Sequence, residues 1–115
     1  MLESKLIIEG GRRIEGEIKV QGAKNSSLPL LAAAFLSCGT SVIHNCPALS
    51  DAFAACRILG SLGCKCTREG DTVVVDSSSA GGITMSDGLM REMRSSIVFL
   101  GAILGRNNRC RLSFP

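Results

Sequence analysis

The segment GAKNSS, residues 22–27, places a lysine at the start of a predicted helix. A glycine ends the strand-like residues before it, and the apolar run that follows predicts a buried helix over about residues 25–37, with Asn25 or Ser26 as its N-cap. The first N–H groups of a helix lack intrahelical partners and attract anions, so a cation there is unfavourable by roughly 0.3–1 kcal/mol. A bound phosphate or carboxylate would relieve this repulsion, which makes Lys24 a candidate anion ligand. The alternative is an ordinary surface lysine beside a capped helix.

Arg94 is a second candidate for an anion site, because it stands in an apolar stretch of another predicted helix, among Met90, Met93 and Ile97. An arginine in such surroundings normally needs an anionic partner. An arginine whose stem follows the helix edge and whose head reaches water fits the same pattern. The segment around Lys24 is not a nucleotide-binding P-loop, because its glycine pattern and the order of lysine and serine differ from that motif, so the segment by itself does not identify the ligand.

The remaining residues that could do chemistry favour structural roles. His44 ends a predicted strand with no cysteine or carboxylate at a telling spacing, so we expect a structural hydrogen bond rather than general-base catalysis. Asp51 is expected to be a favourable charge in the first turn of a helix. The Cys64-x-Cys66 pair has no second pair at zinc-ligand spacing, so no metal site is predicted. All six cysteines are expected to be small buried apolar residues: Cys38, Cys46, Cys56, Cys64, Cys66 and Cys110.

The composition is typical of a folded chain that forms one domain or part of one. Of its 115 residues, 45% are hydrophobic and 3% aromatic, and the formal net charge is +3. So few aromatic side chains argue against a stacking platform for single-stranded nucleic acid, and the basic residues form no run. Charged residues interrupt the N-terminus, and the longest apolar stretch, residues 28–36, is too short to cross a bilayer. We therefore expect a cytoplasmic location.

Hydrophobic periodicity and turn residues predict a chain of the α/β class. Two N-terminal strands are predicted, over residues 5–9 (KLIIE) and 14–20 (IEGEIKV), joined through Gly10-Gly11; the second alternates apolar and charged residues, which indicates one wet face. An apolar stripe at helical spacing, from Leu89 through Met93 to Leu104, predicts one continuous helix over residues 88–105. The other elements expected after the helix at 25–37 are a strand over 40–45, a helix over 49–62, a hairpin of strands 64–68 and 72–76, and a strand over 109–114.

Residues 26–47 and 95–115 form a weak internal repeat at an offset of 69 residues. Each copy has a Ser-Ser pair, an apolar helix, a polar turn and a strand that leads to a proline, Pro47 or Pro115. A basic residue, Lys24 or Arg94, precedes each pair. The repeating unit is helix–strand–helix–strand–strand, and the second copy breaks off after its first strand. We therefore expect the chain to be a fragment that ends within its second unit.

The segments VQGAKNSSLPLLAAA, NCPALSD, MRSSIVFLGAIL and RLSFP occur in this order and resemble the N-terminal quarter of the enolpyruvyltransferases, in particular the UDP-N-acetylglucosamine type. The resemblance implies two domains built from repeated units of two helices and a small mixed sheet, in an inside-out α/β barrel with buried central helices. Residues 1–21 would be strands of the second, C-terminal domain, and residues 22–115 would be an incomplete first, catalytic domain. The N-terminal strands would then lack their sheet partners within this chain.

The resemblance also implies a reaction. The family transfers enolpyruvyl from phosphoenolpyruvate to the 3′-hydroxyl of UDP-N-acetylglucosamine by addition and elimination, at the first committed step of peptidoglycan synthesis, with no cofactor and no metal. Lys24 and Asn25 would bind phosphoenolpyruvate, with Lys24 also catalytic, and Arg94 would contact the nucleotide sugar. A cysteine-bearing loop that should follow RLSFP is absent, and Ser50 stands where some members have lysine. The chain by itself is therefore expected to be inactive, only marginally folded, and prone to self-association through unpaired strands.

Two other functions fit part of this pattern. An enzyme that uses shikimate 3-phosphate as acceptor would share the fold, although Asn25 is more typical of the amino-sugar enzyme. A stand-alone module that binds an anion or nucleotide at the helix N-terminus would need no further domain, and a ligand-free structural domain would need no site. No partner among nucleic acids or membranes is expected.

Overall fold

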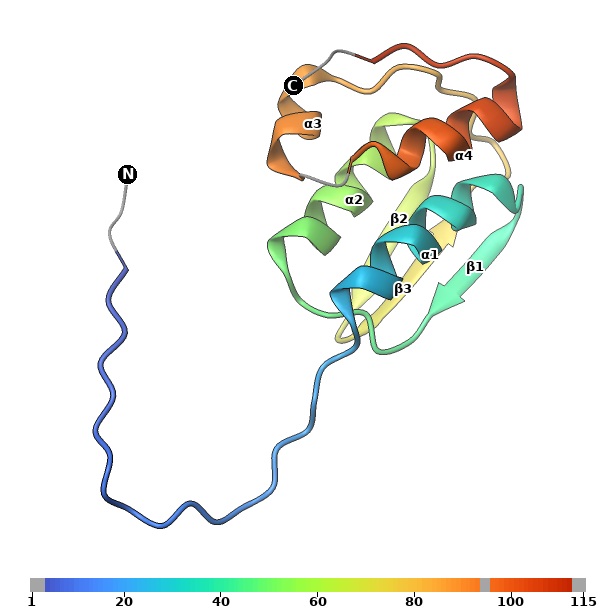
Figure 1. Ribbon diagram of the computed structural model, residues 1–115. Helices are drawn as coiled ribbons and strands as arrows, with labels where there is room; N and C mark the ends of the chain where they lie inside the picture. Colours follow the sequence, from blue (N-terminus) through green and yellow to red (C-terminus); the bar gives the residue numbers. More distant parts are fainter. Residues whose placement is uncertain (1–3, 94–95, 113–115) are drawn as a thin grey trace.

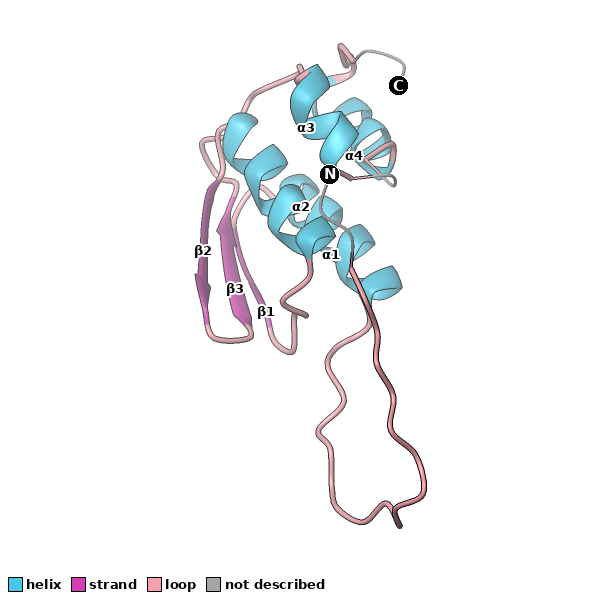
Figure 2. Ribbon diagram, turned by 90° about the vertical axis from the view of Figure 1, so that its left-hand side faces the viewer, coloured by secondary structure: helices cyan, strands magenta, loops and turns pink. Residues whose placement is uncertain are grey.

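Helices cover one face of a three-stranded sheet, as Figure 2 shows. The computed structural model describes residues 4–93 and 96–112. The elements are α1 (Lys24–Leu36), β1 (Thr40–Ile43), α2 (Ser50–Ser61), β2 (Lys65–Glu69), β3 (Thr72–Asp76), α3 (Asp87–Glu92) and α4 (Val98–Asn107). In these described ranges, no helix is both long enough and apolar enough to cross a membrane.

The sheet has the strand order β1-β3-β2, and β3 pairs antiparallel with both neighbours. Val74 lies opposite Val42 on one side and Thr67 on the other. The hairpin between β2 and β3 turns at Gly70, whose φ of 61° lies in the left-handed region that glycine adopts without strain. The order α1-β1-α2-β2-β3 matches the unit predicted for the first copy of the repeat.

The core lies between the sheet and α1 and α2. Val73 and Val75 point from β3 toward the helices and are fully buried, as are Leu31 and Phe35 of α1 and Ile58 of α2. Helix α4 packs against α1, and α3 packs against α2 (Figure 1). The predictions of the helices near 25–37 and 49–62, the strand near 40–45 and the hairpin are confirmed to within one or two residues at most ends.

Helix α1 is buried on one side only. Its sequence is apolar around the whole circumference, which predicted burial on all sides. The structure covers Leu28, Leu31 and Phe35 but leaves 53% of Leu30 and 46% of Leu36 exposed. The prediction of a fully buried helix is therefore wrong for this chain, because its described residues provide cover for only one side of α1.

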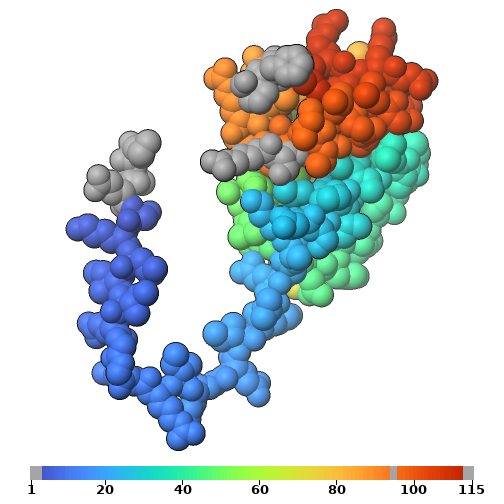
Figure 3. All heavy atoms as spheres, in the orientation of Figure 1, coloured from blue at the N-terminus to red at the C-terminus, as the bar shows by residue number. Residues whose placement is uncertain are grey.

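Residues 4–22 form an extended arm that stands clear of the body except at its last residues, 19–22, which lie beside residues 45–48 (Figures 1 and 3). The strands predicted over 5–9 and 14–20 are not formed. A strand needs a neighbour for its backbone hydrogen bonds, and no described segment pairs with the arm as a strand. The apolar residues of both segments are therefore left 78–96% exposed: Leu6, Ile7, Ile8, Ile14, Ile18 and Val20.

The single helix predicted over 88–105 is wrong. It is divided into α3 and α4, because Met93 has an extended backbone, with φ −133° and ψ 116°. This conformation turns the Met93 side chain into the core, where it is fully buried. The buried face of α4 then contains Phe99, Ala102 and Ile103 instead of the predicted stripe.

The strand predicted over 109–114 is reduced to one bridge in the described residues. Arg111 pairs in parallel with Thr84, through hydrogen bonds from Arg111 N to Ile83 O (2.7 Å) and from Met85 N to Arg111 O (3.0 Å). Residues 113 and 114 of that prediction lie outside the described ranges. The bridge holds the segment after α4 against the segment before α3.

Candidate active site

Lys24 is the first residue of α1, at a helix start that no side chain caps. Ala23 occupies the N-cap position with φ −73° and ψ 131°, so the prediction that Asn25 or Ser26 caps the helix is wrong. An N-cap side chain would accept a hydrogen bond from a first-turn N–H group, and alanine cannot do so. The first-turn donors of α1 therefore remain available to a ligand.

The Lys24 ammonium makes an ion pair with Asp51, with Nζ 2.8 Å from Oδ2. Asp51 lies in the first turn of α2, where the helix dipole favours a carboxylate. The lysine side chain is 49% exposed, whereas the aspartate side chain is only 16% exposed. The pair joins the N-terminal ends of two helices that are adjacent in space but start 26 residues apart in the sequence.

A cavity of about 470 Å³ opens beside this ion pair. It is lined by Lys24, Leu49, Ser50, Asp51, Arg91 and Glu92. Glu92 also accepts a hydrogen bond from Nε of Arg57, at 3.1 Å. Each of the two lining carboxylates is thus already paired with a cation. Among the described residues, the two lining cations, Lys24 and Arg91, and Arg57, which pairs with Glu92 from outside the cavity, stand against two carboxylates, so the described groups carry one positive charge in excess.

The structure brings together some of the predicted site residues. Asn25 lies next to Lys24 in the first turn of α1, and its side chain is exposed. Arg94 lies outside the described residues, so the prediction that it shares this site is untested. Arg91, which the sequence did not single out, lines the cavity from α3. His44 makes the expected structural hydrogen bond, with its Nδ1 3.3 Å from Thr72 Oγ1.

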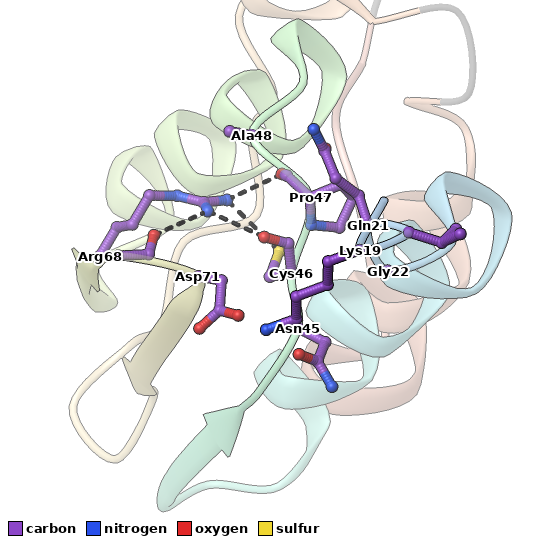
Figure 4. A pocket seen from close by; sticks show the side chains of 11 residues that line it. Lys19, Gln21, Gly22, Asn45, Cys46, Pro47, Ala48, Arg68 and Asp71 are labelled. Atoms are coloured by element: carbon purple, nitrogen blue, oxygen red, sulfur yellow. Dashed lines mark hydrogen bonds between the residues drawn. The ribbon is translucent and has the colours of Figure 1, made fainter. Parts of the chain in front are cut away.

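Asp51 is placed opposite Lys24 by the loop that leads into α2. The guanidinium of Arg68 donates to the carbonyl oxygens of Cys46 (3.0 Å) and Pro47 (3.1 Å), as Figure 4 shows. The guanidinium also lies over the ring of Phe53, which is the fourth residue of α2, with Cζ 4.8 Å from the ring centre. The backbone N–H of Cys46 donates to Asp71 O at 2.8 Å. Arg68 therefore clamps this loop through main-chain oxygens, with no carboxylate partner among the described residues.

Gly22 fixes the start of α1 against the same loop. A Cβ atom at Gly22 would lie 1.6 Å from the carbonyl oxygen of Asn45, which is far inside van der Waals contact. Only glycine lets the two backbones approach this closely. The approach forms one wall of a second cavity of about 270 Å³, between the arm and the body, to which Lys19, Gly22, Asn45 and Arg68 contribute (Figure 4).

The cysteines divide into two groups. Cys46 and Cys64 are buried, as predicted, but Cys38 is exposed and the other three are partly exposed; all six are free thiols. A hydrogen bond from the Cys66 thiol, helped by Arg68 and Arg57, lowers the pKa of Cys56 to about 7, against the opposing effect of burial. The same bond, together with burial, raises the pKa of Cys66. Within the part of the chain that is described, no cluster of three metal-ligating side chains occurs.

Comparison with known proteins shows a consistent match. The family model of EPSP synthase (3-phosphoshikimate 1-carboxyvinyltransferase) matches residues 8–114. The chain is 49% identical over 111 residues to the UDP-N-acetylglucosamine 1-carboxyvinyltransferase 2 of Caldanaerobacter subterraneus subsp. tengcongensis. It is 40% identical over 111 residues to the UDP-N-acetylglucosamine 1-carboxyvinyltransferase of Trichlorobacter lovleyi. Each alignment covers 96% of this chain but only 27% and 26% of the two relatives, respectively.

A solved structure agrees with these sequences. The enolpyruvyl transferase NikO from Streptomyces tendae superposes with a TM-score of 0.82 at 29% identity, over 92% of this chain and 25% of that one. The predicted fold class, α/β of the inside-out barrel type, is thereby confirmed. The chain spans about a quarter of the length of the proteins it matches.

Proposed function

The chain belongs to the EPSP synthase family, and on that premise we propose that the protein of which it forms a part is an enolpyruvyl transferase that uses UDP-N-acetylglucosamine as acceptor. The relatives that support this acceptor are 37–49% identical over 96% of the chain and are named for it. The family model is named for shikimate 3-phosphate instead, so that acceptor is the alternative. The names of these relatives and Asn25 favour the amino sugar.

The proposed reaction is an addition followed by an elimination. The 3′-hydroxyl of UDP-N-acetylglucosamine gives up its proton as its oxygen forms a bond to C2 of phosphoenolpyruvate, while C3 gains a proton, so that a tetrahedral intermediate forms. Phosphate then leaves C2 as C3 loses a proton, which restores the double bond. Because the substrate and the leaving group are both anions, the reaction needs fixed positive charge close to C2.

The uncapped start of α1 is the observation that supports a phosphate site most directly. Its first-turn N–H groups and the Lys24 ammonium lie together at the edge of the cavity. We assign the phosphate of phosphoenolpyruvate to these groups, with Asn25 as a neighbouring polar contact. Arg94 is assigned to the nucleotide sugar by its position in the MRSSI segment.

The rest of the proposal concerns the protein as a whole. Residues 1–21 are assigned to the second domain, because residues 14–20 have the alternation of a strand with a sheet partner, and the apolar side chains of residues 6–20 are exposed here. Residues 22–115 are assigned to the first domain. The proposed setting is peptidoglycan synthesis and cell wall biogenesis in the cytoplasm, in support of cell shape and division. The 115-residue chain alone is expected to be inactive and to associate with itself through the arm.

The test is phosphate release from phosphoenolpyruvate by the protein at the length that its natural gene encodes. We expect release with UDP-N-acetylglucosamine and none with shikimate 3-phosphate. Lys24→Ala should abolish most of the activity, whereas Lys65→Ala, which alters an exposed lysine on β2, should not. Release only with the shikimate ester would contradict the acceptor, and silence with both acceptors would contradict the proposed function.

A further inference from the structure

We propose that Asp51 is a positioning residue for Lys24, which holds the ammonium at the edge of the cavity so that it meets the substrate phosphate in one place. This role rests on the proposed function of the same site. The two groups are 2.8 Å apart, and they belong to different helices. Asp51 acts through Lys24 and contacts no reacting atom in this scheme.

The geometry leaves Lys24 free to bind an anion while it is held. An ammonium group has three N–H donors, and the pair with one carboxylate oxygen uses one of them. The lysine side chain is about half exposed, so a long flexible stem would otherwise adopt many rotamers in water. A fixed carboxylate restricts that stem to the rotamers that place Nζ beside the cavity.

Asp51 is rigid enough to serve as this anchor. Its side chain is only 16% exposed, and it lies at the start of a helix. The loop before that helix is clamped by Arg68 and by the close approach of Gly22 to Asn45. Both partners of the ion pair are therefore fixed to backbone that has little freedom to move.

A purely structural role, in which the ion pair between Lys24 and Asp51 joins α1 to α2, explains the pair less well than the positioning role does. Helices α1 and α2 already pack through buried apolar residues, among them Leu31 and Ala55. A partly exposed ion pair adds little to such an interface. The carboxylate instead lies on the cavity wall, together with Arg91 and Glu92, which is where a substrate would pass.

The experiment is a double-mutant cycle between Asp51→Asn and Lys24→Met in the protein at its natural length, with the Michaelis constant for phosphoenolpyruvate, kcat and the thermal midpoint as readouts. Asp51→Asn keeps the shape of the side chain and removes its charge. We expect it to lower kcat/KM about tenfold to a hundredfold, as for a displaced binding group, with an unchanged midpoint. In the Lys24→Met background it should change kcat/KM less than twofold, and Asp51→Glu should recover part of the loss.

Asp87→Asn is the matched control, because Asp87 also lies in the first turn of a helix, α3, but is exposed and does not line the cavity. It should leave kcat/KM within twofold of the wild type. An equal loss from Asp51→Asn in both lysine backgrounds would overturn the positioning role. So would a loss that follows a lowered thermal midpoint.

A second readout separates this proposal from the proposed function. The mobility of the Lys24 ammonium can be measured by ¹⁵N relaxation in lysine-labelled protein, with Lys24→Met to assign the signal. We expect an ordered ammonium in the wild type and a mobile one in Asp51→Asn. Equal order in both proteins would overturn the positioning role even if phosphate release is normal. An absence of phosphate release from the wild type overturns the proposed function, whatever the relaxation shows.

Discussion

Replacing Gly22 with alanine should lower the free energy of unfolding of this chain. Among its glycines, Gly22 is the one where an added Cβ would come closest to another atom. The new Cβ would lie 1.6 Å from Asn45 O, about 1.8 Å short of the 3.4 Å at which ordinary contact begins, and 2.8 Å from the carbonyl carbon. Both obstacles are backbone atoms, so no side-chain rotation can relieve the clash. Overpacking costs about 1–3 kcal/mol when side chains can adjust, so we expect about 3 kcal/mol or more here.

The assay is urea denaturation of the 115-residue chain, followed by circular dichroism. Because this chain alone is expected to be only marginally folded, every sample contains the same concentration of a stabilising osmolyte such as sucrose. With a slope of about 1–3 kcal/mol per molar urea, the expected loss lowers the midpoint by about 1–3 M. Gly10→Ala is the control, because it makes the same change to the unfolded chain, and a Cβ at Gly10 meets nothing within 4 Å. It should not lower the midpoint. If the two variants unfold at the same urea concentration, the close approach of Gly22 to the 45–48 loop does not exist in solution.

Three further predictions follow from single residues. Ile58→Ala should cost about 2–5 kcal/mol of unfolding free energy, because Ile58 is fully buried between α2 and the sheet; a loss below about 1 kcal/mol in the same titration would contradict the described core. Gly101→Ala in α4 should add about 0.5–1 kcal/mol, since it fills open space in a helix, and a lower midpoint would argue against that helix. The Cys56 thiol, with its pKa lowered to about 7, should react with iodoacetamide at half its maximal rate near pH 7. Cys66→Ala should raise the pH of the half-maximal rate, because it removes the hydrogen bond that lowers this pKa. If Cys66→Ala leaves that pH unchanged, the hydrogen bond between the two thiols is excluded.

Local signals were sufficient for the first repeat unit. Glycine in Glu69-Gly70-Asp71 supplied the left-handed residue that the hairpin turn requires, and Gly63 ended α2 with a φ of 98°. These elements are specified by residues adjacent in the sequence, so no knowledge of tertiary contacts was needed to place them.

Elements whose form depends on distant residues were predicted less well. The break at Met93 involves neither glycine nor proline, and it arises because the extended backbone buries that side chain. The apolar run in residues 5–9 and the alternation in residues 14–20 are typical of strands, but a strand also needs a partner segment, and no described segment pairs with either of them. The sequence pattern of a segment shows that it can form a strand, but the strand forms only where a second segment pairs with it.

The site shows the same division between local and tertiary information. Lys24 could be identified from the sequence, because its conflict with a helix N-terminus is local. Asp51 was recognised only as a first-turn charge, since its pairing with Lys24 depends on how α1 packs against α2. The only sequence signal for the pair is that each residue stands at a helix start, and that signal becomes specific only after the helices are placed.

The charge balance around this pair favours a multiply charged anion over a single carboxylate. Lys24 and Asp51 cancel each other, but they lie at the starts of two helices, and each helix N-terminus carries roughly half a positive charge. The N-termini of α1 and α2 together therefore contribute about one unit of positive charge. Arg91, on the cavity wall, contributes a second unit. A monoanion would neutralise only half of that field, whereas a phosphate dianion matches it. Asp51 thus neutralises the repulsion between Lys24 and the helix start without removing the attraction for phosphate.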